Sequence, residues 1–335
     1  MKRTCLIILI LLLVLTSLAV VLRFDPRSLV CRPKMWGMPL LADIALIDDP
    51  EFIVVPVTIN SKRYRFFVDT CTVNSCVDIR LKPLLGDFVR TSKNVPNLSN
   101  ANLDIDYYKL PENFRLGFLK PYGVIGCYDF SVIGDLTAYD GIIGMNLLND
   151  NLLQLDIENK RMRLVRKPSS AEADSQEDPN YKKELGYPIP LIRDERDWPY
   201  IHIRLSDTIN ELFMVDTGLR GHNYLRRESF DKLRAKEGTE YERVQDGKEQ
   251  IEAIRIAEAR LANIKVSPMV FIANPQSVLG TKFLKYFKMV TFDFRDDKLY
   301  LKPMIDTPSH NAARESGKST GTKVHKSGYS SAIHE

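Results

Sequence analysis

Two aspartates follow apolar stretches in different halves of this 335-residue chain, and each is followed by a threonine. Asp69 follows the run RFFV at residues 65–68, and Asp216 follows the run LFMV at residues 212–215. Such runs favour β-strands, and the small residues after them favour a turn. This arrangement holds a carboxylate at the end of a buried strand, although Asp followed by Ser or Thr and then Gly occurs by chance in roughly one chain of this length in six.

The surroundings of the two aspartates repeat in the same order. Residues 57–68 align without a gap on residues 204–215, and each segment predicts a strand, a turn and a second strand. Further along, residues 140–148 align on 276–284, with two bulky apolar residues before a glycine in both segments. Residues 155–164 then align on 292–301, each predicting a hairpin around a polar turn. We interpret these blocks as an internal duplication.

These residues resemble a known family. An apolar run into Asp-Thr-Gly, followed at a distance by an apolar-apolar-Gly segment and a short helix, is similar to the aspartic peptidases of the pepsin and retroviral type. The ending of the second copy, GxxFLxxFxxVTFDFxxxKLYL, especially resembles bacterial retropepsin-like aspartyl proteases. The resemblance covers about residues 50 to 303. It departs from the family pattern at Cys71, which stands where the family has Gly.

The resemblance implies a fold, a function and a set of site residues. The fold would be all-β with short helices, in a bilobal acid-protease architecture of two homologous β-barrel domains around a pseudo-twofold axis. Asp69 and Asp216 would form the catalytic dyad. The residues that would support the dyad are Thr70, Cys71, Thr217 and Gly218. In the family pattern the hydroxyl after each aspartate hydrogen-bonds inside the opposite loop, and the N–H of the third residue approaches a carboxylate. The residues that would pack under the two loops are Ile142, Ile143, Gly144, Val278, Leu279 and Gly280.

Peptide hydrolysis by water explains why two aspartates would be needed. A base must take a proton from the water, and an acid must protonate the carbonyl oxygen and later the leaving amine. Two carboxylates close together in a partly desolvated site share one proton and can supply both functions. We therefore expect an aspartic endopeptidase that acts on peptides or proteins and needs no cofactor.

Three other functions are considered. The first is a pseudoprotease that keeps peptide binding but has lost turnover through Cys71. The second is a homodimer that pairs the Asp216 loops of two chains. The third, a cysteine peptidase using Cys71 or Cys127, would have to recruit His202 or His222, and no pattern connects them. No spacing of cysteine or histidine suits a zinc ion, so a metal site is not expected.

Composition and patterning predict the organisation of the chain. With 44% hydrophobic and 27% charged residues, it is long enough for two domains with their own cores. The small net charge of +4 argues against nucleic acid as the main partner. The predicted segments are an anchor or signal peptide at 1–24, a connector at 25–50, domain 1 at 51–168, an acidic linker at 169–184, domain 2 at 185–303 and a disordered tail at 304–335.

The amino end is expected to enter a membrane. Lys2 and Arg3 precede an uncharged apolar run at residues 5–22 that is long enough to cross a bilayer. We expect residues 4–22 to anchor the chain as a single span with the catalytic domains outside the cytoplasm. Ser17-Leu-Ala19 leaves open a cleaved signal and a secreted or periplasmic protein. A monomer is expected, with a homodimer as the alternative.

The cysteines and two polar segments leave further alternatives open. Outside the apolar run, Cys31, Cys71, Cys76 and Cys127 are an even number, compatible with two disulfides, and Cys71 and Cys76 share one loop. A short disulfide and buried free thiols are both consistent with this spacing. A hairpin that closes over substrate is expected at 91–106 or 244–249. Tyr107 and Tyr108 could line a cleft, but we interpret them as exposed or half-buried strand residues.

Overall fold

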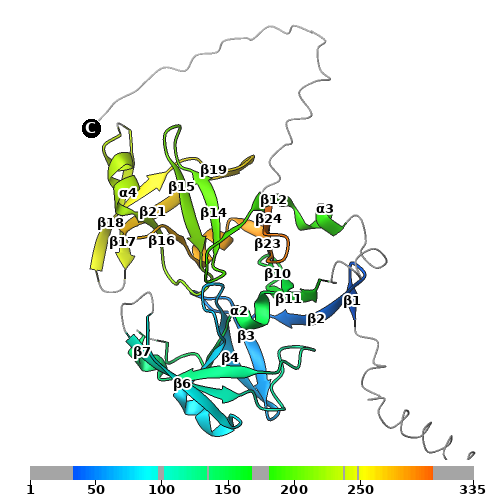
Figure 1. Cartoon of the computed structure of the whole chain (residues 1–335). Coiled ribbons are helices and arrows are strands. Elements are labelled where there is room, and N and C mark those ends of the chain that lie inside the picture. The colour runs from blue at the N-terminus through cyan, green and yellow to red at the C-terminus, as the bar shows by residue number, and fades with distance from the viewer. Residues whose placement is uncertain are drawn as a thin grey trace, which may run out of the picture. The chain divides into compact units, whose positions relative to one another are not determined.

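The computed structural model describes residues 33–96, 102–133, 136–167, 181–236, 238–246 and 249–304 (Figure 1). They form a mainly β structure of three sheets with short helices, which confirms the predicted fold class at this level. No helix among these residues is both long and apolar enough to span a bilayer. The predicted anchor at 1–24 lies outside the described residues, as does the tail from residue 305 onward.

The first copy forms a seven-stranded sheet that positions Asp69. In spatial order, its strands are β3 (Val54–Ile59), β4 (Lys62–Val68), β9 (Gly141–Ile143), β5 (Cys76–Asp78), β8 (Val124–Tyr128), β7 (Asn102–Lys109) and β6 (Phe88–Pro96). The 3-10 helix η2 (Ile79–Leu84) follows β5, and η3 (Phe130–Val132) follows β8. Phe66, Phe67 and Val68 at the end of β4 are all buried, so this strand is covered on both faces just before the aspartate.

The second copy repeats this order. Its matching strands are β14 (Pro199–Arg204), β15 (Asn210–Val215), β22 (Val278–Leu279), β16 (Asn223–Arg226), β21 (Met269–Asn274), β18 (Glu249–Ile256) and β17 (Glu240–Asp246). Helix α4 (Arg227–Arg234) follows β16 as η2 follows β5. The sheet also holds β13 (Ile192–Arg193), β19 (Ala259–Leu261) and β20 (Ile264–Val266), and isolated bridges of the first copy stand where β14 pairs with β19 and β19 with β20. Parallel and antiparallel pairings also match strand for strand. The duplication therefore extends to strand order and direction.

A third sheet joins the ends of both copies. Its order is β1 (Lys34–Met35), β2 (Met38–Ala45), β11 (Arg161–Arg166), β10 (Asn151–Asp156), β23 (Phe287–Asp293), β24 (Lys298–Pro303) and β12 (Tyr187–Pro190). At its centre, Gln154 pairs with Thr291, Leu153 with Phe292 and Leu155 with Val290. Gln154 and Thr291 are equivalent in the two copies, so the register is two-fold symmetric about this buried pair.

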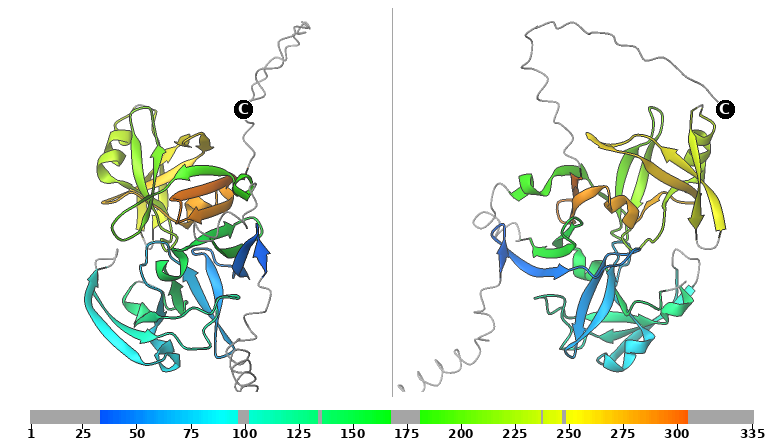
Figure 2. Two further views of the ribbon diagram at one scale, coloured as in Figure 1. Left: turned by 45° about the vertical axis from the view of Figure 1, so that its right-hand side comes forward. Right: turned by 180° about the vertical axis from the view of Figure 1, so that it is seen from behind.

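Two segments that we predicted to be connections, residues 25–50 and 169–184, contain a strand and part of a helix. Within the connector predicted at 25–50, β2 runs beside β11 (Figure 2). This strand buries Met38 and Ala42. Within the linker predicted at 169–184, helix α3 (Tyr181–Leu185) begins at residue 181 and buries Tyr181 and Leu185. Residues 168–180 lie outside the described part of the chain.

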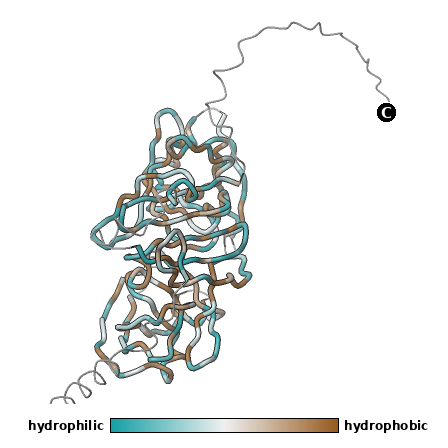
Figure 3. The backbone as a smooth tube through the Cα atoms, turned by 90° about the vertical axis from the view of Figure 1, so that its right-hand side faces the viewer, coloured by the Kyte–Doolittle hydropathy of each residue, from teal (hydrophilic) through white to brown (hydrophobic). Residues whose placement is uncertain are grey.

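Short helices begin directly after the two predicted glycines. Helix α2 (Met145–Leu148) follows Gly144, and α5 (Thr281–Leu284) follows Gly280. Each helix buries three of its four residues, so it packs against the core directly after the preceding strand. Figure 3 shows hydrophobic and hydrophilic segments interspersed along the chain. In β14, buried positions alternate with more exposed ones, as the period of two in a half-buried sheet requires.

Candidate active site

Each aspartate is held by the strand that its apolar run forms and by a parallel neighbour. The backbone N–H of Asp69 donates to the carbonyl of Ile143, at 2.9 Å, where β4 runs parallel to β9. The N–H of Asp216 donates to the carbonyl of Leu279, also at 2.9 Å, where β15 runs parallel to β22. The apolar residue before each glycine therefore fixes the backbone of the aspartate in its own copy.

Gly144 and Gly280 leave room for the loops that follow the aspartates. A β-carbon on Gly144 would lie 2.6 Å from the carbonyl oxygen of Thr72. A β-carbon on Gly280 would lie 2.7 Å from the carbonyl oxygen of Leu219, the residue equivalent to Thr72. Neither glycine has a positive φ, so close approach of the loop is the reason for glycine at both positions.

The two aspartate loops bind each other through the threonines that follow the aspartates. Thr70 Oγ1 donates to the carbonyl of Val215 at 2.7 Å, and Thr217 Oγ1 donates to the carbonyl of Val68 at 2.7 Å. In return, each hydroxyl accepts the backbone N–H of the other threonine, at 3.0 and 3.2 Å. Both side chains are buried, and all four bonds join opposite copies within one chain.

This reciprocal network brings Asp69 and Asp216 together. Each carboxyl group lies close enough to the other to affect its pKa. In each loop the backbone N–H two residues after the aspartate donates to the carboxyl group of that aspartate. Cys71 N–H donates to Asp69 Oδ1 at 2.7 Å, and Gly218 N–H donates to Asp216 Oδ1 at 2.8 Å. A β-carbon on Gly218 would lie 2.4 Å from the Asp69 carboxyl carbon, so this carboxyl group rests directly on the opposite loop.

The two carboxyl groups have unequal surroundings. Burial raises the pKa of Asp69, but hydrogen bonds from the Thr72 hydroxyl and the Cys71 N–H oppose this rise. Burial, followed by the charge of Asp69, raises the pKa of Asp216 well above its usual range. Asp69 is half-buried whereas Asp216 is buried, and Leu219 offers no hydroxyl to match Thr72. Of the two, Asp216 is therefore the group that keeps a proton and Asp69 the group that is ionised.

Cys71 fits the loop without backbone strain. It does not have a positive φ, so a β-carbon is tolerated at this position. Its side chain is buried beside Met214 and Val278 of the second copy, with Trp198 and Tyr200 packed around this cluster. Burial and the nearby carboxylates raise the pKa of the Cys71 thiol well above its usual range. A thiol that stays protonated is a poor nucleophile, which argues against a cysteine peptidase at this position.

The described cysteines do not form the disulfides that the spacing allowed. Cys71, Cys76 and Cys127 are free and buried. Cys76 lies opposite Gly126 in the β5–β8 pair and Cys127 opposite Val77, so the two thiols point to opposite faces of the sheet. Burial raises the pKa of Cys76 to about 12 and that of Cys127 to about 11. Cys31 lies outside the described residues.

The sequence interpretation missed three polar residues that brace the first loop. Besides Thr72, Ser75 Oγ accepts the N–H of Gly144 at 2.9 Å and donates to Asn146 Oδ1 at 2.8 Å. In the second copy, Asn223 Oδ1 accepts the N–H of Gly280 at 3.3 Å. A hydroxyl three residues after an aspartate in a turn can bond back to it, and that spacing could have identified Thr72.

Both segments considered for a covering hairpin belong to hairpins. Residues 91–106 fall in the β6–β7 hairpin and 244–249 in the β17–β18 hairpin, with the tips at 97–101 and 247–248 outside the described residues. His222, just after the second aspartate loop, has Nε2 2.9 Å from the carbonyl oxygen of Gln245 in β17. The interpretation of Tyr107 and Tyr108 as exposed or half-buried is wrong, because both are buried in the sheet.

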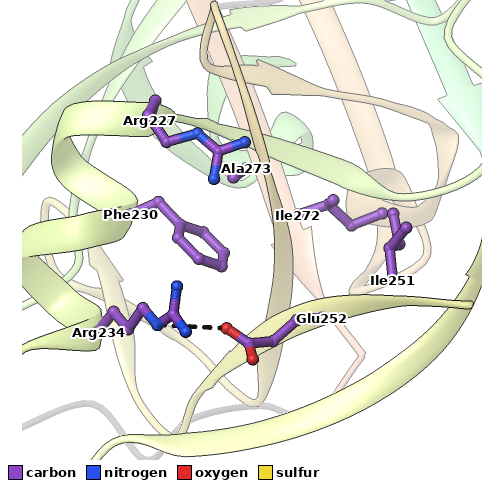
Figure 4. Close-up of a pocket in the computed structure, with 7 residues that line it drawn as sticks. All are labelled: Arg227, Phe230, Arg234, Ile251, Glu252, Ile272 and Ala273. Carbon is purple, nitrogen blue, oxygen red and sulfur yellow. Dashed lines mark ion pairs between the residues drawn. The ribbon is translucent and has the colours of Figure 1, made fainter.

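Two pockets in the described part of the chain lie away from Asp69 and Asp216. One, of about 310 Å³, lies between α4 and strands β18 and β21. Phe230 projects between Arg227 and Arg234 in this pocket (Figure 4), and Arg234 forms an ion pair with Glu252 at 3.4 Å. The other, of about 620 Å³, lies on the third sheet beside Trp36. Its two aspartates, Asp43 and Asp156, are both paired with Arg163. Neither pocket brings two unpaired carboxyl groups together.

No family model matches this sequence, and a search of curated proteins likewise finds no match. The case for a site therefore depends on the geometry of the Asp69 and Asp216 loops.

Proposed function

We propose that the protein is an aspartic endopeptidase that hydrolyses peptide bonds with Asp69, Asp216 and an activated water. The observation that carries this proposal is the reciprocal threonine network, which joins the two aspartate loops of one chain and leaves each carboxyl group near enough to shift the pKa of the other. The matched strand orders support a bilobal, retropepsin-like architecture of two β-barrel domains. The apolar run at 5–22 supports a membrane-tethered or exported enzyme.

In the first step, water adds to the carbonyl carbon of the peptide bond. Ionised Asp69 takes a proton from the water as its oxygen forms a bond to this carbon. Protonated Asp216 gives its proton to the carbonyl oxygen as the C=O π bond breaks. The product is a neutral tetrahedral diol, and the dyad still holds one proton, now on Asp69.

In the second step, the C–N bond breaks. Asp69 gives its proton to the leaving nitrogen, and Asp216 takes one back from a hydroxyl of the diol as the new carboxyl group forms. The starting protonation state is thereby restored. The higher pKa of Asp216 and the hydrogen bonds to Asp69 favour this division of roles.

Two alternatives make different demands on the site. A homodimer that pairs two Asp216 loops would leave Asp69 without a role, whereas here Asp69 lies against Gly218 of its own chain. A pseudoprotease would follow if Cys71 distorted its loop, but the N–H of Cys71 bonds to Asp69 as that of Gly218 bonds to Asp216. Both observations favour an active single-chain dyad.

A pair of peptides tests the dyad without knowledge of the natural substrate. One peptide carries a secondary hydroxyl in place of the scissile carbonyl and mimics the tetrahedral diol, and the matched peptide lacks only that hydroxyl. A working dyad should bind the hydroxyl peptide at least about 100-fold more tightly, as expected for a transition-state analogue. Calorimetric titration with the full chain measures both affinities.

The advantage of the hydroxyl should disappear in Asp216→Asn, while the affinity for the peptide without a hydroxyl should stay within about threefold, because its contacts do not involve the carboxyl proton. Equal affinity for both peptides in the unmodified chain would instead identify a peptide-binding module whose aspartates do not act as a dyad.

A further inference from the structure

An exposed aromatic turn lies between β7 and β8 of the first copy. Phe118 is 57% exposed and Tyr122 is 94% exposed, and the exposed Lys120 stands between them. Leu116 and Leu119 form a backbone bridge that closes the turn, and Leu116 is buried beneath it. The turn is therefore anchored to the core while it presents two aromatic rings to its surroundings.

Cations surround this turn. The backbones of Arg115 and Thr58 exchange hydrogen bonds of 2.8 and 3.0 Å, which places the turn beside the β3–β4 hairpin. Arg63 lies opposite Thr58 in that hairpin, and Lys62 precedes it; both side chains are exposed. In residues 58–64 and 110–124 the charged residues are Lys62, Arg63, Arg115 and Lys120, against the single carboxylate of Glu112.

The turn also lies near the point where residues 1–32 join the described structure. A β-carbon on Gly117 would lie 3.0 Å from the Cα of Ala42 in β2, so the turn packs on this strand. Two residues earlier, the N–H of Leu40 donates to the carbonyl of Pro33 at 2.8 Å. At about 3.3 Å for each residue of a strand, Leu40 and Ala42 are only about 7 Å apart.

The expected membrane segment ends close to this point in the sequence. Leu22, the last residue of the apolar run, precedes Pro33 by a stretch that can extend to at most about 40 Å. A chain anchored through residues 5–22 would therefore keep this side of the first copy near the bilayer surface. Phenylalanine and tyrosine favour the membrane interface, and lysine and arginine are attracted to anionic headgroups.

We propose that the turn at 116–123, together with Lys62 and Arg63, forms a contact site for the anionic surface of the bilayer that holds the amino-terminal segment. The aromatic rings enter the interface and the cations lie over the headgroups. This contact fixes the orientation of the chain above the membrane. It involves neither Asp69 nor Asp216, and it does not depend on peptidase activity.

Tryptophan fluorescence in lipid nanodiscs tests the contact. The full chain with Tyr122→Trp is placed in discs of mixed zwitterionic and anionic lipid whose acyl chains carry bromine, which quenches nearby indoles. Tyr241→Trp is the control, because Tyr241 is 48% exposed on β17 of the second copy. Trp36 and Trp198 are present in both variants and contribute equally. The added tryptophan at 122 should be quenched at least about twofold more than the one at 241.

Adding Lys62→Glu, Arg63→Glu and Lys120→Glu to the Tyr122→Trp chain should remove this excess quenching, because the cations hold the rings at the anionic surface. Equal quenching of the two reporters would overturn the proposal. So would emission at position 122 that changes with the number of chains in each disc but not with bromine, since that result would identify a second copy as the partner.

Discussion

At the scale of single residues, Thr70 and Thr217 are what make two separate aspartates a pair. Each hydroxyl donates to one backbone carbonyl of the opposite loop and accepts one N–H from it. Because all of these groups are buried, no water can replace a lost partner without cost. The family resemblance implied that each hydroxyl would bond inside the opposite loop, as the structure has it. Local patterns alone could not predict this, because the contact joins residues 147 positions apart.

Replacing Thr217 by valine tests this exchange. Valine has the shape of threonine but leaves the carbonyl of Val68 and the N–H of Thr70 without partners, at a cost of about 1–3 kcal/mol for each group. We expect a lower free energy of unfolding in urea and a loss of turnover. Thr217→Ser keeps the hydroxyl and should retain most of both. Equal behaviour of the two variants would contradict a role for the hydroxyl.

Cys71 departs from the glycine of the family pattern, and its backbone conformation is one that a residue with a β-carbon can adopt. Since φ is not positive there, Cys71→Gly relieves no strain. It removes a buried side chain next to Met214 and Val278, so we expect a loss of about 1–2 kcal/mol in unfolding free energy. Turnover should change by less than about tenfold.

Cys71→Ala separates the effect of backbone freedom from that of the side chain, because alanine keeps the β-carbon. It should be intermediate in stability between Cys71 and Cys71→Gly. An inactive parent chain that gains peptidase activity only with Cys71→Gly would show that the cysteine had disabled the site.

The pH dependence of stability follows from the raised pKa of both aspartates. A carboxyl group whose pKa is higher in the folded state stabilises the fold below its unfolded pKa, near 3.9, and this contribution is lost as pH rises through the folded value. Asp216→Asn removes the buried acid. The variant should therefore gain stability relative to the parent as pH increases from acidic to neutral.

Thermal unfolding measures this gain, at about 1.5 °C in Tm for each 1 kcal/mol in a chain of 335 residues. Asp231→Asn on the exposed face of α4 is the control and should track the parent. If Asp216→Asn instead lost stability relative to the parent as pH rose toward neutral, the change would have the wrong sign and would contradict a buried, shared proton.

At the scale of elements, the two glycines define how closely each loop packs on its own sheet. Gly144→Ala would place a β-carbon 2.6 Å from the carbonyl oxygen of Thr72. The loop must then move, and Thr72 loses its bond to Asp69. We expect a loss of about 1–3 kcal/mol in stability and of at least about tenfold in turnover.

Gly280→Ala tests the same contact in the second copy, where Leu219 makes no bond to Asp216 through its side chain. It should cost similar stability but less activity than Gly144→Ala. Urea unfolding and steady-state kinetics on one substrate separate the two effects. A larger loss of activity in Gly280→Ala would contradict the assignment of Thr72 as a support for Asp69.

Local elements were predictable because their signals are local. Apolar runs, polar turns and the glycine before each short helix identified β4, β15, α2 and α5 from a few neighbouring residues. The burial of Tyr107 was not predictable, since it depends on which face of β7 meets the core. The pairing of β2 with β11 joins residues more than a hundred positions apart, and no local pattern encodes it.

At the scale of the whole molecule, the two copies contact each other through two interfaces that are each two-fold symmetric. The strands β10 and β23 meet in a register that is symmetric about Gln154 and Thr291. The aspartate loops meet through equally symmetric threonine bonds. Both interfaces lie within one chain, so a second chain is not needed to bring Asp69 and Asp216 together.

Cleavage of a peptide library tests the central claim most directly. The full chain is incubated at acidic pH with the library, alone and with a hydroxyl-containing transition-state analogue, beside Asp69→Asn, Asp216→Asn and a mixture of these two variants. We predict cleavage by the parent chain, its suppression by the analogue, loss of activity in both variants and no recovery in the mixture. Cleavage that survives Asp69→Asn, or no cleavage by the parent under any condition, would contradict an Asp69–Asp216 dyad working within one chain.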